Sequence, residues 1–160
     1  HLGILLQEPF FDMLRRIYMQ RCKMLRKKSQ ISISESDGAF LMGIPDPTEK
    51  LLDGEVFVQI APFPGESHVV SGRAVLWRNP CCDPGDLITV KYVENASLQK
   101  WAVNVVVFPC NSMCTRSLSS ETSGGDLDGE KFSILWDQEL VPPDSVTYEA
   151  VDYDDIAAKS

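Results

Sequence analysis

The sequence predicts a mainly β domain that follows one N-terminal helix, and three observations support this fold class. Apolar residues recur at helical spacing near the start of the chain, β-rich runs separated by turn signals follow from residue 31, and little other helical signal remains. With 160 residues, 44% of them hydrophobic, the chain is long enough to bury one core. Six or seven short strands with so little helix are typical of a barrel or a sandwich.

The first predicted element is an amphipathic helix of about five turns. Pro9 suits the first position of a helix, where its missing N–H costs nothing. A single apolar stripe follows, made of Phe10, Leu14, Ile17, Tyr18, Cys22 and Leu25. Up to Lys28 there are seven basic and two acidic residues, whereas the rest of the chain has 8 basic and 21 acidic ones. This basic face suits a nucleic-acid backbone, and a solvated helix face explains the charges equally well.

Six β-rich runs and one short helical turn are predicted after this helix. Turn signals such as Pro84-Gly85-Asp86 separate them. The predicted strands are Ala39–Ile44, Glu55–Ile60, His68–Trp77, Leu87–Val93, Asn104–Phe108 and Phe132–Trp136, and the helical turn is Ala96–Trp101. Residues 110–129 are predicted to form a long loop rich in Ser, Thr and Gly, and loops of this length are usually functional or disordered.

These patterns predict a basic helix over residues 1–30, a β domain, either a barrel or a sandwich, over 31–143 and an acidic tail or linker over 144–160. The chain starts with His1 rather than Met, and we expect it to be an excerpt of a larger protein. It has no run of 18 apolar residues and no secretory start. We therefore expect an intracellular protein, cytoplasmic or nuclear, with no membrane partner. The net charge of −8 argues against nonspecific binding of nucleic acid by the chain as a whole.

The cysteines give little sign of a structural role. Their odd count and the missing secretory signal argue against a disulfide framework. A zinc site is the alternative, but only one pair has a spacing that zinc fingers use. The five are Cys22, Cys81, Cys82, Cys110 and Cys114.

The residues suited to chemistry are concentrated at the end of the long loop, in the run SGGDLDGEKF that ends at Phe132. Three carboxylates, Asp126, Asp128 and Glu130, stand at alternate positions and so project to one side of an extended or tightly turned backbone. Their charges repel one another unless a cation is present, and magnesium prefers such oxygen ligands. The flanking glycines allow unusual backbone angles and the approach of a phosphate ester. They are Gly124, Gly125 and Gly129.

Two other interpretations of this motif come from the residues alone. A bare Asp-x-Asp-Gly is more often an acidic turn in solvent than a metal site. A calcium EF-hand loop matches the first acidic positions, but its sixth position, which needs glycine for a sharp bend, is Lys131. The flanks also indicate a loop and a strand where an EF-hand has helices.

Several further motifs accompany the acidic run, in a fixed order along the chain. They are Leu41-Met42-Gly43-Ile44, Gly54–Gln59, Gly72–Pro80, Pro84–Asp86, Ile134–Asp137 and Leu140–Pro142. In this order and spacing, the set resembles the catalytic segment of the eukaryotic-type RNA-dependent RNA polymerases, which make double-stranded RNA for gene silencing. The resemblance covers about Pro9 to Pro143, nearly all of the chain.

The resemblance implies a double-psi β-barrel that is one part of a larger, two-barrel polymerase. It implies that Asp126, Asp128 and Glu130 ligate Mg²⁺, with Mn²⁺ as a substitute, in two-metal transfer of a nucleotide to an RNA 3′-hydroxyl. The implied partners are RNA template and product, NTPs and the rest of the polymerase chain. This segment alone is expected to be inactive.

The resemblance also implies a basic residue beside the metal. Arg78, followed by Asn79 and Pro80, matches a motif in which a guanidinium group contacts phosphate or sugar oxygens, although a surface arginine at a strand end is the simpler interpretation. The residues expected to contact substrate are Arg78, Asn79, Gly124, Gly125 and Lys131. Lys131 and Lys91 are weaker candidates for phosphate contact, because solvation at the surface explains each of them more simply.

One residue departs from the family pattern, because the motif usually ends in aspartate where this chain has Glu130. The longer side chain moves the carboxylate outward by roughly one bond length, and magnesium demands near-octahedral geometry. We expect retained metal binding with an altered or reduced rate. Two alternatives are a noncatalytic member of the family that binds RNA or acts as a scaffold, and an unrelated β-rich interaction domain with an accidental acidic turn.

Overall fold

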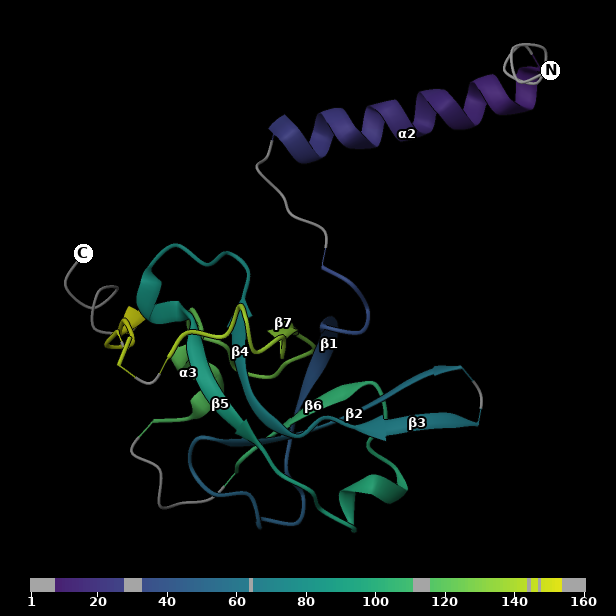
Figure 1. Cartoon of the computed structure of the whole chain (residues 1–160). Coiled ribbons are helices and arrows are strands. Elements are labelled where there is room, and N and C mark those ends of the chain that lie inside the picture. Colours follow the sequence, from purple (N-terminus) through teal and green to yellow (C-terminus); the bar gives the residue numbers. More distant parts are fainter. Residues whose placement is uncertain are drawn as a thin grey trace. The chain divides into compact units, whose positions relative to one another are not determined.

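Residues His1–Ser34 and Glu35–Ser160 form two separate units in the computed structural model of the chain (Figure 1). The structure describes residues 8–27, 33–63, 65–110, 116–143, 145–146 and 148–153. Within these ranges, no helix combines the length and the apolar character needed to cross a membrane.

The first unit contains the predicted amphipathic helix, α2, which spans Pro9–Lys27. Its 19 residues match the expected length of about five turns. Asp12 accepts hydrogen bonds from Arg15 at 2.8 Å and Arg16 at 2.7 Å, one helical turn further along. None of the helical side chains is buried, so the apolar stripe faces solvent within this unit.

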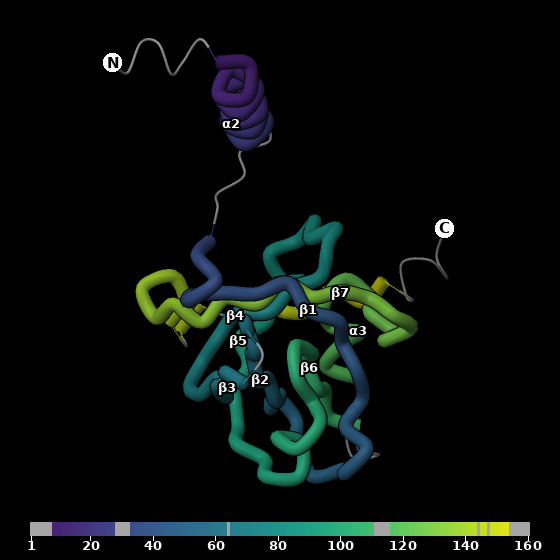
Figure 2. The backbone as a smooth tube through the Cα atoms, turned by 90° about the vertical axis from the view of Figure 1, so that its right-hand side faces the viewer, coloured from purple at the N-terminus to yellow at the C-terminus, as the bar shows by residue number. Residues whose placement is uncertain are grey.

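The described residues of the second unit form seven strands. Six of these close into a barrel, whose course Figure 2 shows. The seven strands are β1 (Gly38–Pro45), β2 (Glu55–Phe63), β3 (Glu66–Val69), β4 (Gly72–Arg78), β5 (Ile88–Tyr92), β6 (Val105–Phe108) and β7 (Lys131–Leu135). The ring runs β2-β5-β4-β7-β1-β6, and β6 pairs back with β2 to close it. Strand β3 lies outside this ring and forms a hairpin with β2.

The strand pairings have an internal two-fold symmetry. Two pairs are parallel, β1 with β6 and β2 with β5, and the others are antiparallel. Exchanging β1, β2 and β4 with β5, β6 and β7 leaves every pairing of the ring unchanged. Two interlocked halves of this kind make a double-psi β-barrel, which confirms the predicted fold class.

Alternating side chains from the ring strands fill the barrel. On β2, Val56 and Val58 point inward, whereas Phe57 between them belongs to a smaller core outside the ring. The inner core consists of Val56, Val58, Val70, Ala74, Leu76, Val90, Tyr92, Val106, Phe108, Leu118, Phe132 and Ile134. This rigid core fixes the strand ends from which the candidate site projects.

Two of the predicted elements are wrong in detail. The run His68–Trp77 is two strands, β3 and β4, because Gly72 has a φ of +97° and the chain changes direction there. The predicted loop 110–129 contains a short helix, α3 (Leu118–Glu121), which buries Leu118 in the core. The helical turn predicted near residue 100 is confirmed as η2 (Leu98–Lys100), and the other strands agree with prediction to within three residues at each end.

Candidate metal centre

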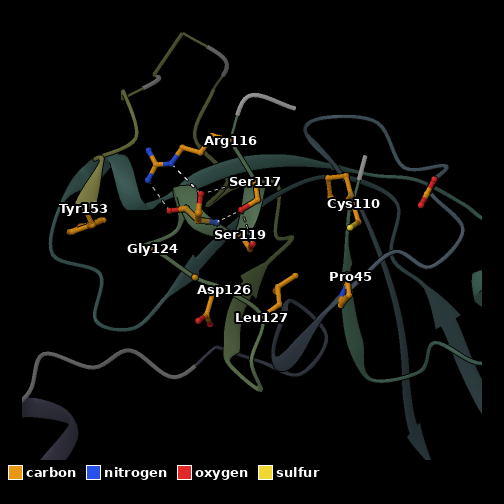
Figure 3. A pocket seen from close by; sticks show the side chains of 13 residues that line it. Pro45, Cys110, Arg116, Ser117, Ser119, Gly124, Asp126, Leu127 and Tyr153 are labelled. Carbon is orange, nitrogen blue, oxygen red and sulfur yellow. Dashed lines mark hydrogen bonds between the residues drawn. The ribbon is translucent and has the colours of Figure 1, made fainter. Parts of the chain in front are cut away.

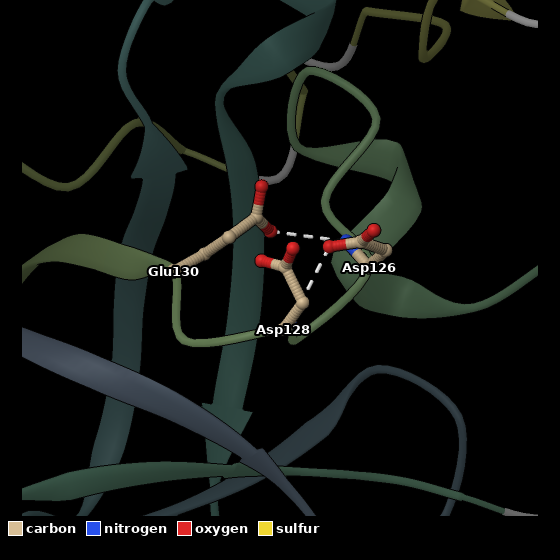
Figure 4. Close-up of side chains that lie close together, drawn as sticks. All are labelled: Asp126, Asp128 and Glu130. Carbon is tan, nitrogen blue, oxygen red and sulfur yellow. Dashed lines mark hydrogen bonds between the residues drawn. The ribbon is translucent and has the colours of Figure 1, made fainter.

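Asp126, Asp128 and Glu130 converge in the connection between α3 and β7 (Figure 4). Each offers one oxygen atom, and these atoms lie within 4.8 Å of one another. Both aspartates are exposed and Glu130 is half-buried. Among the described residues, this is the only group of three or more His, Cys, Asp or Glu side chains arranged to hold a metal ion.

The backbone of this connection is strongly curved. Ser123, Gly124, Leu127 and Gly129 all have positive φ, between 55° and 112°. This conformation suits glycine and is rare for a bulky residue such as leucine. Gly125 is required for a different reason, since a Cβ there would lie 2.7 Å from the Ser119 carbonyl oxygen and 2.9 Å from Glu130 Oε2.

Leu127 anchors the turn between the two aspartates. Its side chain packs against the barrel core, while Asp126 and Asp128 on either side of it stay exposed. Space for it exists because residue 43 is glycine: a Cβ there would lie 2.8 Å from Leu127 Cδ2. Core packing therefore holds Leu127 in a left-handed conformation that it would otherwise rarely adopt.

Hydrogen bonds within the motif hold the three acids together. The backbone N–H of Asp126 donates to Glu130 Oε2 at 3.0 Å, and that of Asp128 approaches Asp126 Oδ1 at 3.4 Å. The Gly43 N–H donates to the Glu130 carbonyl at 3.0 Å and ties the end of the turn to β1. The carboxylates are thus positioned by the chain itself.

Arg78 reaches the same place from the end of β4. Like Ala74 and Leu76, which alternate with it along β4, Arg78 points to the inner side of the barrel. Its backbone pairs with Phe132 on β7. The guanidinium group therefore emerges at the mouth of the barrel, where it forms an ion pair with Glu130 and donates from Nη1 to the Ser123 carbonyl at 2.8 Å. The side chains of Arg78 and Glu130 are 26% and 12% exposed, so the pair is partly shielded from water.

The other predicted contact residues are placed less uniformly. Asn79 and Gly124 are exposed, and Gly125 is buried. Lys131 points to the opposite side of β7 from buried Phe132, because side chains alternate along a strand. Its ammonium group lies 5.6 Å from the ring centroid of Phe40. Lys91 is an exposed residue of β5, two strands from β7. The structure thus brings Arg78 to the acids but directs both lysines elsewhere.

The donor set fits a hard divalent cation. Three carboxylates supply only oxygen, and an octahedral magnesium ion has ligands about 3 to 4 Å apart at its short bond length. The present span of 4.8 Å is slightly wider than this, so a small movement of the side chains completes the geometry. No cysteine belongs to the group, and Cys22, Cys81, Cys82 and Cys110 are free thiols. Cys114 lies outside the described residues.

Comparison with known proteins identifies the family. The family described as RNA dependent RNA polymerase matches residues 2–160. The chain belongs to this family. The resemblance seen in the sequence is therefore confirmed, and an unrelated β domain with an accidental acidic turn is excluded.

Individual members of the RNA-dependent RNA polymerase family resemble the chain over most of its length. It is 38% identical over 148 residues to RNA-dependent RNA polymerase 1 of Arabidopsis thaliana, covering 91% of the chain and 13% of that protein. It is 32% identical over 152 residues to RNA-dependent RNA polymerase 6 of the same plant, covering 85% and 12%. A solved structure, RNA dependent RNA polymerase QDE-1 from Thielavia terrestris, shares the fold with a TM-score of 0.71 at 24% identity, over 89% of the chain and 15% of that protein. The chain thus spans a small part of these polymerases.

Beside the acids, the chain has a hollow of about 1060 Å³ (Figure 3). Asp126 and Leu127 form part of its wall, and serines of α3 form another. Arg116 lines it too, but Nη2 of its guanidinium group already donates to the carbonyls of Ser120 at 2.9 Å and Val151 at 2.7 Å. The volume is that of a small-molecule pocket, and one of the candidate metal ligands faces it.

Sequence reasoning missed three residues that shape the site. Ser123 meets Arg78 through its carbonyl and donates from its hydroxyl to the Pro80 carbonyl at 2.8 Å. Asp86 is fully buried and accepts hydrogen bonds from Tyr153. The sequence Pro84-Gly85 correctly predicted the turn that contains Asp86. No local pattern reveals a contact across the 67 positions that separate it from Tyr153.

Proposed function

We propose that the protein containing this chain copies RNA into RNA, adding nucleotides from NTPs to an RNA 3′-hydroxyl at the centre formed by Asp126, Asp128 and Glu130. The observation that carries the proposal is the convergence of these carboxylates beside Arg78 in a chain of the RNA-dependent RNA polymerase family. The double-stranded product would serve gene silencing within the cell, in the cytoplasm or the nucleus.

Magnesium, or manganese in its place, is the cation we propose for this centre. When bound, it would favour loss of the proton from the attacking 3′-hydroxyl and would offset the negative charge of the departing pyrophosphate. Asp126 and Asp128 are exposed, and each offers an oxygen atom to the group, which suits direct ligation. Both oxygens of Glu130 already have partners, Arg78 and the Asp126 N–H, so its contribution to the cation is the weakest of the three.

Arg78 is proposed to bind the incoming nucleotide. Its planar guanidinium group can contact two oxygen atoms of a phosphate or a sugar at once. Glu130 and Ser123 hold this group at the mouth of the barrel, next to the acids. Asn79 follows Arg78 in the chain and is exposed, and the absence of side chains at Gly124 and Gly125 leaves room for the phosphates.

The proposal is tested with Asp126→Asn in the full-length protein, which keeps the shape of the side chain and removes its charge. Incorporation of nucleotides on an RNA template should fall by about a hundredfold or more, and Mn²⁺ binding measured by calorimetry should weaken. Asp53→Asn, at an exposed aspartate of the β1–β2 connection, is the matched control and should change neither. Unchanged incorporation by Asp126→Asn would contradict the proposed function. A wild-type protein that binds RNA and Mn²⁺ but never incorporates nucleotides would point to the noncatalytic alternative.

A further inference from the structure

The segment that follows Arg78 leaves the sheet and needs another support. Residues 79–83 form no strand, and the short helix η1 (Pro84–Asp86) follows them. Arg78 is the last residue of β4, so the strand holds its backbone on one side and this segment holds it on the other. The position of the Arg78 guanidinium group therefore depends on this segment.

A buried carboxylate organises this segment. Asp86 has no exposed surface, and its Oδ2 atom accepts hydrogen bonds from the backbone N–H groups of Cys82 at 3.0 Å and Asp83 at 3.1 Å. Asp83 in turn accepts from the Gly85 N–H at 2.8 Å, and Asp83 and Asp86 form a reciprocal capping box at the start of η1. Burial alone would raise the pKa of Asp86, but the hydrogen bonds from Tyr153 and the backbone outweigh it and hold the pKa below its ordinary value.

Tyr153 attaches a distant part of the chain to this carboxylate. Its hydroxyl group lies 2.7 Å from Asp86 Oδ1 and 2.8 Å from Oδ2. The hydrogen bond to Asp86, together with burial and the nearby Asp86 charge, raises the pKa of Tyr153 to about 12, so the phenol stays protonated and keeps donating. The backbone of Glu149 also lies against Gly85, where a Cβ would collide with the Glu149 carbonyl.

Ser123 connects this segment to the acidic turn. Its hydroxyl donates to the Pro80 carbonyl at 2.8 Å, and its own carbonyl accepts from Arg78. A left-handed backbone, with φ of 55°, gives Ser123 the orientation that serves both contacts. The chain on both sides of Arg78 is thereby fixed, by β4 before it and by Asp86, Tyr153 and Ser123 after it.

We infer that Asp86 and Tyr153 are positioning residues for the polymerase reaction, which hold the segment after Arg78 so that its guanidinium group stays oriented for the incoming nucleotide. Asp86 has no exposed surface and cannot touch substrate, and Tyr153, which also lines the hollow beside Asp126, acts through its hydrogen bond to Asp86. The inference rests on the proposed function, because it assigns these residues to the nucleotide contact of Arg78. Tyr153 lies outside the closed ring of strands and outside both hydrophobic cores, so its hydroxyl can be removed while the barrel stays intact.

The test is Tyr153→Phe in the full-length protein, which removes only the hydroxyl group. The KM for NTPs should rise about three- to tenfold, while kcat at saturating NTP changes by less than about twofold and the melting temperature by less than about 2 °C. Tyr148→Phe is the matched control, since Tyr148 is an exposed tyrosine of the same tail, 63% accessible, and should behave as wild type. A wild-type KM for Tyr153→Phe overturns the inference. A parallel loss of kcat and melting temperature also overturns it, because it shows a purely structural role.

A second variant covers the case in which Tyr153→Phe folds poorly. Ser123→Gly removes the hydroxyl that holds Pro80 and accepts the positive φ without strain. It should reproduce the rise in KM, and an unchanged KM overturns the inference. Asp126→Asn in the same assay separates the two proposals. If Asp126→Asn is inactive while Tyr153→Phe and Ser123→Gly keep a wild-type KM, the proposed function stands and the positioning role fails.

Discussion

Replacing Glu130 by aspartate removes one methylene group from the candidate metal centre and keeps the carboxylate. The shorter side chain withdraws the carboxylate by roughly 1.5 Å. It then cannot reach both Arg78 and the Asp126 N–H, which Glu130 contacts on its two oxygens. A hydrogen bond between charged groups contributes about 1.5 to 3 kcal/mol, and the partial exposure of Arg78 lowers this to about 1 to 2 kcal/mol.

This interaction with Arg78 competes with a cation for the same carboxylate. Freed from it, the residue at position 130 should bind metal more tightly, by about 5- to 30-fold for a difference of 1 to 2 kcal/mol. We therefore expect Glu130→Asp to tighten Mn²⁺ binding, measured by calorimetry on the full-length protein, and to raise the rate of nucleotide incorporation. Glu94→Asp, at an exposed glutamate, is the control.

A double-mutant cycle shows whether Arg78 is the cause. In an Arg78→Met background the competing cation is absent, so Glu130→Asp should change Mn²⁺ affinity by less than about threefold. Equal rates and equal affinities for wild type and Glu130→Asp would refute the claim that the longer side chain alters the geometry of the site. Tighter binding of equal size in both backgrounds would instead assign the effect to chain length alone.

Three further predictions concern the surroundings of the acids. Arg78→Lys should raise the KM for NTPs by about tenfold, measured by steady-state incorporation. The planar guanidinium group can contact Glu130, Ser123 and a phosphate at once, whereas a single ammonium group cannot. Gly43→Ala should lower stability by about 1 to 3 kcal/mol, measured by thermal unfolding, because the new methyl group collides with the buried ring of Phe132 and with Leu127. The resulting shift of Leu127, which stands between the two aspartates, should also weaken Mn²⁺ binding measured by titration calorimetry. Because the pKa of Asp86 lies below its ordinary 3.8, its carboxylate stabilises the fold above that pH and loses this contribution as the pH falls further. Asp86→Asn should therefore flatten the acid limb of a pH–stability curve.

The parts of this structure that depend on nearby residues could be predicted from the sequence. Helix α2 follows from the 3.6-residue period of its apolar stripe, and the inward and outward residues of β2 follow from alternation. The acids converge because Asp126, Asp128 and Glu130 alternate across a turn rich in glycine. In each case the chemistry of one short segment decides the outcome.

The parts that depend on register and distant contacts could not be predicted in this way. Lys131 was a weak candidate for phosphate contact, and its direction depends on the register of β7, which turns it outward toward Phe40. Closure of the ring by β2 and β6 and the contact between Asp86 and Tyr153 join segments tens of residues apart. Helix α3 was missed because one leucine, Leu118, supplies its packing, and the surrounding serines indicate loop.

Arg78 also changes how the repulsion within the centre must be understood. Three converging carboxylates would require a divalent cation if nothing else carried positive charge nearby. The guanidinium group of Arg78 neutralises Glu130, the most buried of the three, and the two aspartates face water, which screens their charges. The centre can therefore fold in its converged form before any metal binds. A cation then binds to two aspartates that are already oriented. Glu130 can contribute to binding the cation only as far as Arg78 releases it and binds another group.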